Sequence, residues 1–240
     1  MTRDRILQLE QSLDRGETIN TDFEPRLMNI VFQEWFVKHG TSPRYFFLIV
    51  LILTVIYIIF MKKEEYVLFS TGLATMGAEM LIVFAFQVIY GYIYIRIGAI
   101  VTAFLLGLLP GALIGRSWGQ KDIFKLFVAE MLLLFMLFIF FVWAAYFRIE
   151  LHPLYFLVYG FLFSLLCGYQ FPIAASIIGE KTSPAAGCLA ADLCGASVGT
   201  LATGTILIPI WGIRTAAVFL IIVKISSSVI VMFTGKMRAK

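Results

Sequence analysis

Charged residues, histidines and cysteines are scarce in this chain of 240 residues. Only 14% of the residues are Asp, Glu, Lys or Arg, whereas soluble domains contain about 25%. The two histidines, His39 and His152, lie outside the apolar segments, and a helical haem site needs histidine pairs within them. The three cysteines form no Cys-x-x-Cys pair, which argues against a zinc site or a disulfide framework. We therefore expect no cofactor, no metal and no catalytic Ser/His/Asp set.

Apolar residues make up 60% of the chain, and the mean hydropathy is +0.91. One globular core cannot hide that much apolar surface, so the composition predicts an integral membrane protein with the lipid bilayer as its main partner. It excludes a free-standing soluble enzyme, a nucleic-acid-binding protein and a disordered tail. The first apolar segment begins near residue 45, so we expect no secretory signal peptide.

Seven apolar segments have the length of a membrane span, which is about 20 residues. Because backbone groups in lipid must be satisfied internally, we expect each segment to be a helix. The fold class is therefore an all-α integral membrane protein over residues 45–240, with about seven transmembrane helices. The predicted spans are Tyr45–Met61, Tyr66–Tyr90, Ile97–Ile114, Ile123–Phe147, Leu154–Ile178, Gly187–Pro209 and Ile213–Thr234.

Residues 1–44 form a polar N-terminal tail. Ile6, Leu9 and Leu13 recur at helical spacing, which predicts a short helix before Gly16. Residues 27–37 form an amphipathic stretch with three aromatic residues. This stretch suits a helix at the membrane surface, and equally a helix packed on the rest of the protein.

The distribution of basic residues predicts the orientation in the membrane. One side, here called side A, has nine basic residues and the other has three. Side A is therefore expected to be cytoplasmic, with the C-terminus on it. With seven spans, the N-terminal tail would lie outside the cell. Lys38, Arg44 and the missing export signal argue against a tail on that side. The conflict disappears if the first apolar segment does not cross the membrane. The side A residues are Lys62, Lys63, Arg116, Lys121, Lys125, Lys181, Lys236, Arg238 and Lys240, and the others are Arg96, Arg148 and Arg214.

Two predicted spans have a small residue at every fourth position, and such ladders let helix backbones approach closely. We expect them to be helix-packing surfaces, or else a moving interface as in a transporter. Pro110 within the first ladder should kink its helix. The ladders are Gly107, Gly111 and Gly115, and then Gly187, Ala191, Gly195 and Gly199.

A charged side chain at the centre of a span costs about 2.5–3.5 kcal/mol, so each one needs a reason. Asp192 lies five residues from side A and Lys224 ten, a difference in depth of about 7 Å that a lysine side chain covers. We predict that these two residues pair, the alternative being that Asp192 caps its helix while Lys224 extends to the headgroups. The candidate binding residues of a polar pocket open to side A are Asp192, Lys224, Gln170 and Glu130, with Glu79 near the middle of the membrane.

Three segments resemble the membrane-embedded relatives of spermidine synthase, the fused aminopropyltransferase-like proteins of bacteria. Residues 18–25 (TINTDFEP) are similar to the family's Asn-Thr-Asp-x-x-Pro element, and residues 168–172 (GYQFP) to its Gly-x-Gln/Glu-Phe-Pro motif. Residues 191–196 (ADLCGA) and 207–212 (LIPIWG) are similar to a later run, although Leu189 replaces its tyrosine. The resemblance implies that the tail is the end of a synthase-like domain. It also implies a location in the inner membrane of a bacterium. The catalytic α/β domain would precede residue 1, so no catalytic residue is carried over.

Residues 111–121 (GALIGRSWGQK) also resemble a loop motif of the major facilitator superfamily, with Gly115 in place of its aspartate. In that superfamily the loop follows the second helix of a six-helix half. Here it follows the third predicted span, which implies one extra helix and then a six-helix half. Half a transporter needs a partner chain or a second copy to enclose a path.

The leading hypothesis is a membrane anchor and interaction subunit, non-catalytic on its own, with a protein partner or a second copy. One alternative is a half-transporter for a small cationic solute, with Asp192, Glu79 and Gln170 lining the path. The other is a structural subunit of a respiratory or electron-transfer complex that contacts quinone or lipid without holding a redox centre. The resemblance implies polyamine-type chemistry, but we do not expect this chain alone to catalyse it.

Overall fold

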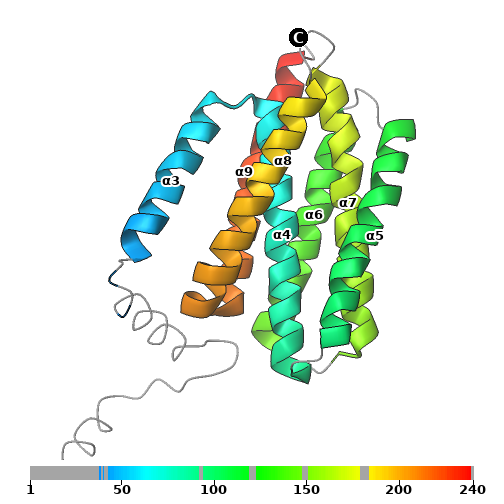
Figure 1. Ribbon diagram of the computed structural model, residues 1–240. Helices are drawn as coiled ribbons and strands as arrows, with labels where there is room; N and C mark the ends of the chain where they lie inside the picture. The colour runs from blue at the N-terminus through cyan, green and yellow to red at the C-terminus, as the bar shows by residue number, and fades with distance from the viewer. Residues whose placement is uncertain are drawn as a thin grey trace, which may run out of the picture.

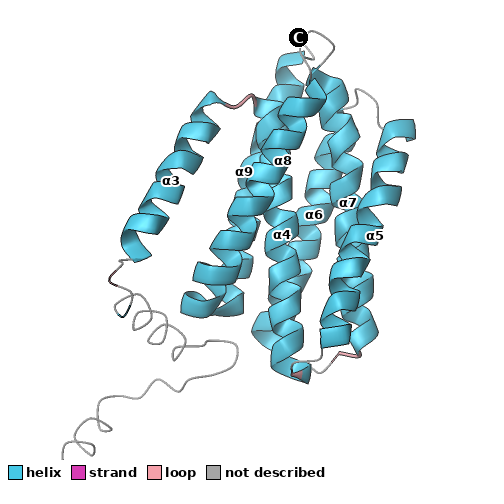
Figure 2. Cartoon of the chain, viewed as in Figure 1, coloured by secondary structure: helices cyan, strands magenta, loops and turns pink. Residues whose placement is uncertain are grey.

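The computed structural model describes residues 38, 40, 43–91, 94–118, 123–147, 151–178 and 184–238 (Figure 1). These residues are almost entirely helical, and Figure 2 shows no strand among them. The predicted all-α membrane fold is confirmed. The expected helices of the N-terminal tail and the Asn-Thr-Asp-x-x-Pro element lie outside the described residues.

Seven helical segments follow the predicted spans to within a few residues. Two of them end in wider π-helical turns, named η. The segments are α3 (Pro43–Phe60), α4 (Lys63–Tyr90), α5 (Tyr94–Trp118), α6 (Ile123–Val142) with η1 (Trp143–Phe147), α7 (Pro153–Ile178), α8 (Pro184–Leu201) with η2 (Ala202–Trp211), and α9 (Gly212–Arg238).

The last 48 apolar helical residues, from Ala186 to Phe233, contain two spans. A single helix of that length would measure about 72 Å, more than twice the thickness of the hydrocarbon core. Gly212 separates α8 and η2 from α9, and its positive φ of 82° is a conformation that glycine adopts without steric cost. Pro209 removes a backbone donor just before this break, within the π-helical turn.

Local sequence also sets the ends of α4. The Glu65 carboxylate accepts a 2.9 Å hydrogen bond from the Lys62 backbone N–H, which satisfies one of the free donors at the helix start. At the other end, Gly91 has φ of 74°, and its N–H donates to Gln87 O at 2.8 Å. The helix therefore begins and ends at polar or flexible residues that flank a 28-residue segment.

Helices α4–α9 form the bundle, and consecutive helices run in opposite directions (Figure 1). The loop before α4, the end of α5, the start of α8 and the C-terminus lie at one end of the molecule, which is side A. By length and composition, five helical stretches of the described residues are suited to cross a membrane. The last of them, Ala186–Phe233, contains the two spans formed by α8 with η2 and by α9. The apolar part of α3, Phe47–Phe60, is shorter.

The helices of the bundle pack as two equivalent sets of three, α4–α6 and α7–α9. Helix α5 packs on α7 just as α8 packs on α4, and these are the two most extensive contacts. Helix α9 contacts α4 as α6 contacts α7, while α4 meets α7 and α6 meets α9. Exchanging the two sets therefore reproduces the pattern of contacts. Because α4 and α7 run in opposite directions, this is the arrangement of an inverted repeat.

The small residues lie where these two largest contacts form. A Cβ atom on Gly111 of α5 would collide with the Leu165 carbonyl of α7, and one on Gly195 of α8 with the Phe69 carbonyl of α4. Such backbone contact is how helices associate in lipid, which offers no hydrophobic drive. Gly107, Gly115 and Gly199 make equivalent contacts, whereas a Cβ on Gly187 meets only the end of the Glu65 side chain.

We expect Gly195→Ala to destabilise the protein, because the new methyl group would force α8 away from the Phe69 carbonyl. Overpacking of this kind costs about 1–3 kcal/mol. Thermal unfolding of the purified protein in detergent measures the effect. Gly98→Ala on α5 is the matched control, since nothing lies within 4 Å of its Cβ position, and it should leave the melting temperature unchanged or raise it. Equal melting temperatures for both variants would contradict the packing role.

Candidate functional site

Five polar side chains from four helices meet inside the bundle, and we call them the polar cluster. Each of them is at most 4% exposed, so the cluster is closed to solvent and to lipid. Its members are Thr71 of α4, Glu130 of α6, Gln170 of α7, and Lys224 and Ser228 of α9.

The centre of the cluster is an ion pair between Lys224 and Glu130. The Lys224 Nζ atom lies 2.8 Å from Glu130 Oε1, and both side chains are 0% exposed. A single charge at this depth would be expensive, and the pair neutralises both charges. Because Lys224 belongs to α9 and Glu130 to α6, the bond joins two helices that are equivalent in the inverted repeat.

A second polar link joins α4 and α7, which are also equivalent. The Gln170 amide donates to Glu130 Oε1 at 3.1 Å, and the Lys224 ammonium donates to the Thr71 hydroxyl oxygen, also at 3.1 Å. The Thr71 hydroxyl in turn donates to Gln170 Oε1 at 2.6 Å. Each hydrogen bond strengthens the others in a medium of low dielectric constant, so the cluster acts as one network.

Backbone carbonyls satisfy the rest of the network. The Ser228 hydroxyl has one proton and donates it to Lys224 O at 2.8 Å, so its 3.5 Å approach to Glu130 Oε2 is a weak contact. The Thr71 hydroxyl lies 2.8 Å from Val67 O as well, and that carbonyl competes with Gln170 for its single proton. Such bonds within a helix orient the side chains before the helices meet.

Three of the five residues singled out from the sequence lie in the polar cluster, namely Lys224, Gln170 and Glu130. The predicted pair between Asp192 and Lys224 is not formed, because the ammonium lies on Glu130 instead. Asp192 is half-buried on α8, facing Gly72 of α4. Glu79 is buried on α4, and within the described part of the chain no hydrogen bond joins it to the cluster.

The reason for the wrong pairing is the order of the helices in space. Helices α8 and α9 follow each other in the chain, but the contacts of α9 with that segment are made by η2, at the end away from side A. Near side A, α8 packs on α4, and α9 lies against α4 and α6. Glu130 is the eighth residue of α6, about two turns from side A, so its depth suits Lys224 as well as that of Asp192 did.

Sequence reasoning missed Thr71 and Ser228. Ser228 follows Lys224 by one helical turn and so shares its face, which was an available signal. Thr71 lies in a run of small and apolar residues where a hydroxyl usually bonds to its own helix, and only the contact between α4 and α7 distinguishes it.

The cluster holds a cation with oxygen atoms and has no nucleophile paired with a base. Within the described ranges, no three His, Cys, Asp or Glu side chains gather closely enough to hold a metal ion. What the arrangement does chemically is to bind an ammonium group through one carboxylate and one hydroxyl in a site closed to the surface.

Comparisons with known proteins find no matching family model, no similar curated protein and no similar solved structure.

Removing one partner of the buried pair should destabilise the protein strongly, because the other charge then remains buried alone. We expect Lys224→Met to cost about 3–5 kcal/mol of unfolding free energy. The double variant Glu130→Gln/Lys224→Met should lose much less unfolding free energy than the sum of the losses in the two single variants. Equilibrium unfolding of the four proteins of this double-mutant cycle, in a bilayer-like detergent mixture, measures the coupling.

The matched cycle replaces Asp192 by Asn together with Lys224 by Met. Because these side chains do not pair, their effects should add to within about 0.5 kcal/mol. Coupling between Asp192 and Lys224, with additivity between Glu130 and Lys224, would show that the pairing in the membrane differs from the one described.

Proposed function

We propose that this chain is a non-catalytic membrane subunit that anchors and contacts a partner protein, like the transmembrane part of the spermidine synthase-like proteins it resembles. The observation that carries the proposal is the position of α3, which stands beside the bundle rather than within it (Figure 1). The charged groups of the polar cluster, Lys224 and Glu130, already bind each other inside the bundle. A partner protein would therefore contact the outer surface of the chain.

Helix α3 touches the bundle mainly near its C-terminal end. The Tyr57 ring lies 6.4 Å from the Phe69 ring of α4, and Ile58 and Met61 pack against the core. Away from this contact, a groove of about 420 Å³ separates α3 from α8; Leu53 lines one side of it and Leu193 the other. Most large apolar residues of α3 are exposed: Tyr45, Leu48, Ile49, Leu51, Ile52, Leu53, Val55, Ile56, Ile59 and Phe60.

A helix that is surrounded by lipid on most sides gains van der Waals contacts when it packs against another helix. Helix α3 is therefore the element of this chain best placed to contact another chain. It also follows the N-terminal tail directly, and the resemblance implies that this tail is the end of a synthase-like domain.

A photo-crosslinking amino acid at Leu51 of α3 tests this proposal in native membranes. We expect a crosslink to a synthase-like protein or to a second copy of this chain, identified by mass spectrometry. Leu109 of α5 is the matched control, since both side chains are about equally exposed, at 60% and 66%. The same crosslinker at Leu109 should label lipid alone. Lipid adducts from both positions would contradict the proposal.

A second candidate function, one half of a transporter for a small cationic solute, is favoured by the polar cluster and the inverted repeat. Inverted repeats are common in transporters, where the solute binds between the repeats near the middle of the membrane. Glu130 and Thr71 hold the ammonium of Lys224 where the two sets of helices meet. An amine solute carries the same group and would replace Lys224 at these oxygen atoms.

Uptake of radiolabelled putrescine by protein reconstituted into liposomes tests this second function. Glu130→Gln should abolish uptake, because the amide keeps the shape of the carboxylate and loses its charge. Asp192→Asn, which removes a carboxylate outside the cluster, should retain most of the uptake. Wild-type uptake no higher than that of empty liposomes would eliminate this candidate.

A further inference from the structure

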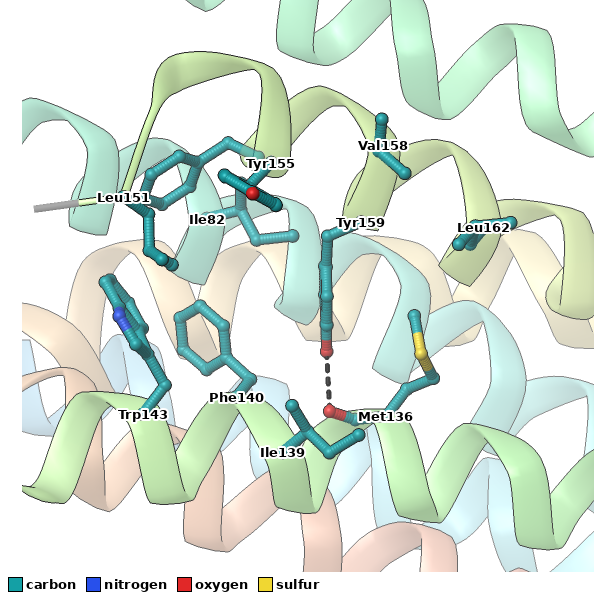
Figure 3. Close-up of a pocket in the computed structure, with 11 residues that line it drawn as sticks. Ile82, Met136, Ile139, Phe140, Trp143, Leu151, Tyr155, Val158, Tyr159 and Leu162 are labelled. Carbon is teal, nitrogen blue, oxygen red and sulfur yellow. Dashed lines mark hydrogen bonds between the residues drawn. The ribbon is translucent and has the colours of Figure 1, made fainter. Parts of the chain in front are cut away.

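Two cavities of similar volume lie in the bundle, and their linings differ. The first, of about 330 Å³ between α6, η1 and α7, is walled by apolar and aromatic side chains (Figure 3). The Tyr159 hydroxyl in its wall already donates to Met136 O at 2.8 Å, as the dashed line shows. This lining does not identify an occupant. The second, of about 310 Å³, lies between α5 and α7 at the end away from side A, and it is lined in part by cationic and polar groups.

The second cavity, which we call the α5–α7 cavity, has a polar rim and an apolar floor. Its rim contains Arg96 of α5 and His152, which directly precedes α7, and both side chains are exposed. Ile100 and Leu157 lie about one turn deeper on the two helices, and Phe86 of α4 is buried behind them. A ligand in this cavity therefore meets polar groups at the surface and apolar groups further in.

Both helices that form the cavity have their N-terminal ends at it. Consecutive helices run in opposite directions, so α5 and α7 are parallel, and Figure 1 shows their starts side by side at the end away from side A. The free N–H groups at the start of a helix carry a partial positive charge of about half an elementary charge. Two such ends add to the positive charge of Arg96, and together they favour an anion.

The polar side chains of the rim have donors available for such an anion. The Leu154 N–H donates to His152 Nδ1 at 3.3 Å, so the ring proton lies on Nε2, where it can be donated to a ligand. In the part of the chain that the structure describes, no carboxylate pairs with the Arg96 guanidinium. An arginine in this state can bind two phosphate oxygens through parallel hydrogen bonds.

Carboxylates are remote from the α5–α7 cavity in the described part of the chain. Four of its five acidic side chains lie in the half of the bundle near side A, namely Glu64, Glu65, Glu130 and Asp192. The fifth, Glu79, lies seven residues before Phe86 on α4, which places it about 10 Å deeper. No described group at the rim would attract the ammonium of a zwitterionic headgroup, so the charges favour a ligand that is negative overall.

Exposed aromatic side chains place the rim of the cavity at the surface of the membrane. Tyr94, Tyr146, Tyr155 and Trp211 lie at the end away from side A, and each of them is at least 57% exposed. Tyrosine and tryptophan gather at the level of the lipid headgroups. Because Arg96 follows Tyr94 by two residues, its charge lies at the depth of lipid phosphates, and the apolar floor lies at the depth where acyl chains begin.

From these features we infer that the α5–α7 cavity binds an anionic phospholipid, with its phosphate between Arg96 and His152 and the start of one acyl chain against Ile100 and Leu157. The rim charges suit the phosphate, and the apolar floor suits a lipid better than a free anion. The volume is at the lower end of the range for ligand pockets, about 300–1,000 Å³, so most of each acyl chain stays in the bilayer. The inference does not rest on the functions proposed above.

Titration of the delipidated full chain in detergent with phosphatidylglycerol tests the inference, with the bound lipids counted by native mass spectrometry. We expect one site of highest affinity, and about tenfold weaker binding of phosphatidylethanolamine with the same acyl chains. Arg96→Gln should weaken phosphatidylglycerol binding about tenfold, which corresponds to about 1.4 kcal/mol. Arg96→Lys keeps the charge and should retain most of the affinity. The matched control, Arg214→Gln, removes a cation at the same end of the bundle but outside the cavity, and should leave binding unchanged.

A second variant tests the cavity itself. Ala99→Phe fills the space while both rim side chains stay in place, and it should abolish the site of highest affinity. Inorganic phosphate at millimolar concentration should not displace the lipid, because it has no acyl chain to occupy the floor. Displacement by inorganic phosphate, equal affinity for the two lipids, equal losses in Arg96→Gln and Arg214→Gln, or unchanged binding in Ala99→Phe would overturn the inference.

Discussion

The structure depends on the neutralisation of Lys224 inside the bilayer. An ammonium at that depth cannot remain alone, and here it is held by a carboxylate of α6, a hydroxyl of α4 and, through Glu130, an amide of α7. The pair itself adds little net stability compared with a well-packed apolar core, because both groups lose their hydration. Its consequence is that any packing that separates α6 from α9 leaves two buried charges without partners.

Close backbone contact is the second constraint, and it acts on different helices. The ladders of small residues bring α5 onto α7 and α8 onto α4, while the polar cluster joins α4, α6, α7 and α9. The two devices are thus complementary, because α5 and α8 contribute nothing to the cluster. Polar bonds select the partners in the centre, and glycine contacts attach the two remaining helices at equivalent places of the inverted repeat.

The spans could be predicted from the sequence because the length of an apolar segment is a local property. Ile123–Phe147 matches the extent of α6 with η1, and Leu154–Ile178 matches α7 to within one residue. The ladder glycines could be recognised for the same reason, since their spacing is written within one helix. The partner of Lys224 could not be predicted in this way. Several carboxylates lie at a similar depth in the membrane, and only the helices that pack against α9 decide which of them Lys224 meets. Thr71 gave no signal either, because its hydroxyl meets Gln170 only where α4 packs on α7.

The placement of the polar cluster limits how the two sets of helices can move. Both of its links, Glu130 to Lys224 and Thr71 to Gln170, connect helices that are equivalent in the repeat, so the cluster lies where the two sets meet. A rotation of one set against the other leaves atoms near such a point almost in place and moves distant atoms most. A rotation about the cluster therefore keeps its hydrogen bonds, and the helix ends are the parts that it would displace. A sliding movement would break both links at once and expose two charges to a medium that cannot solvate them.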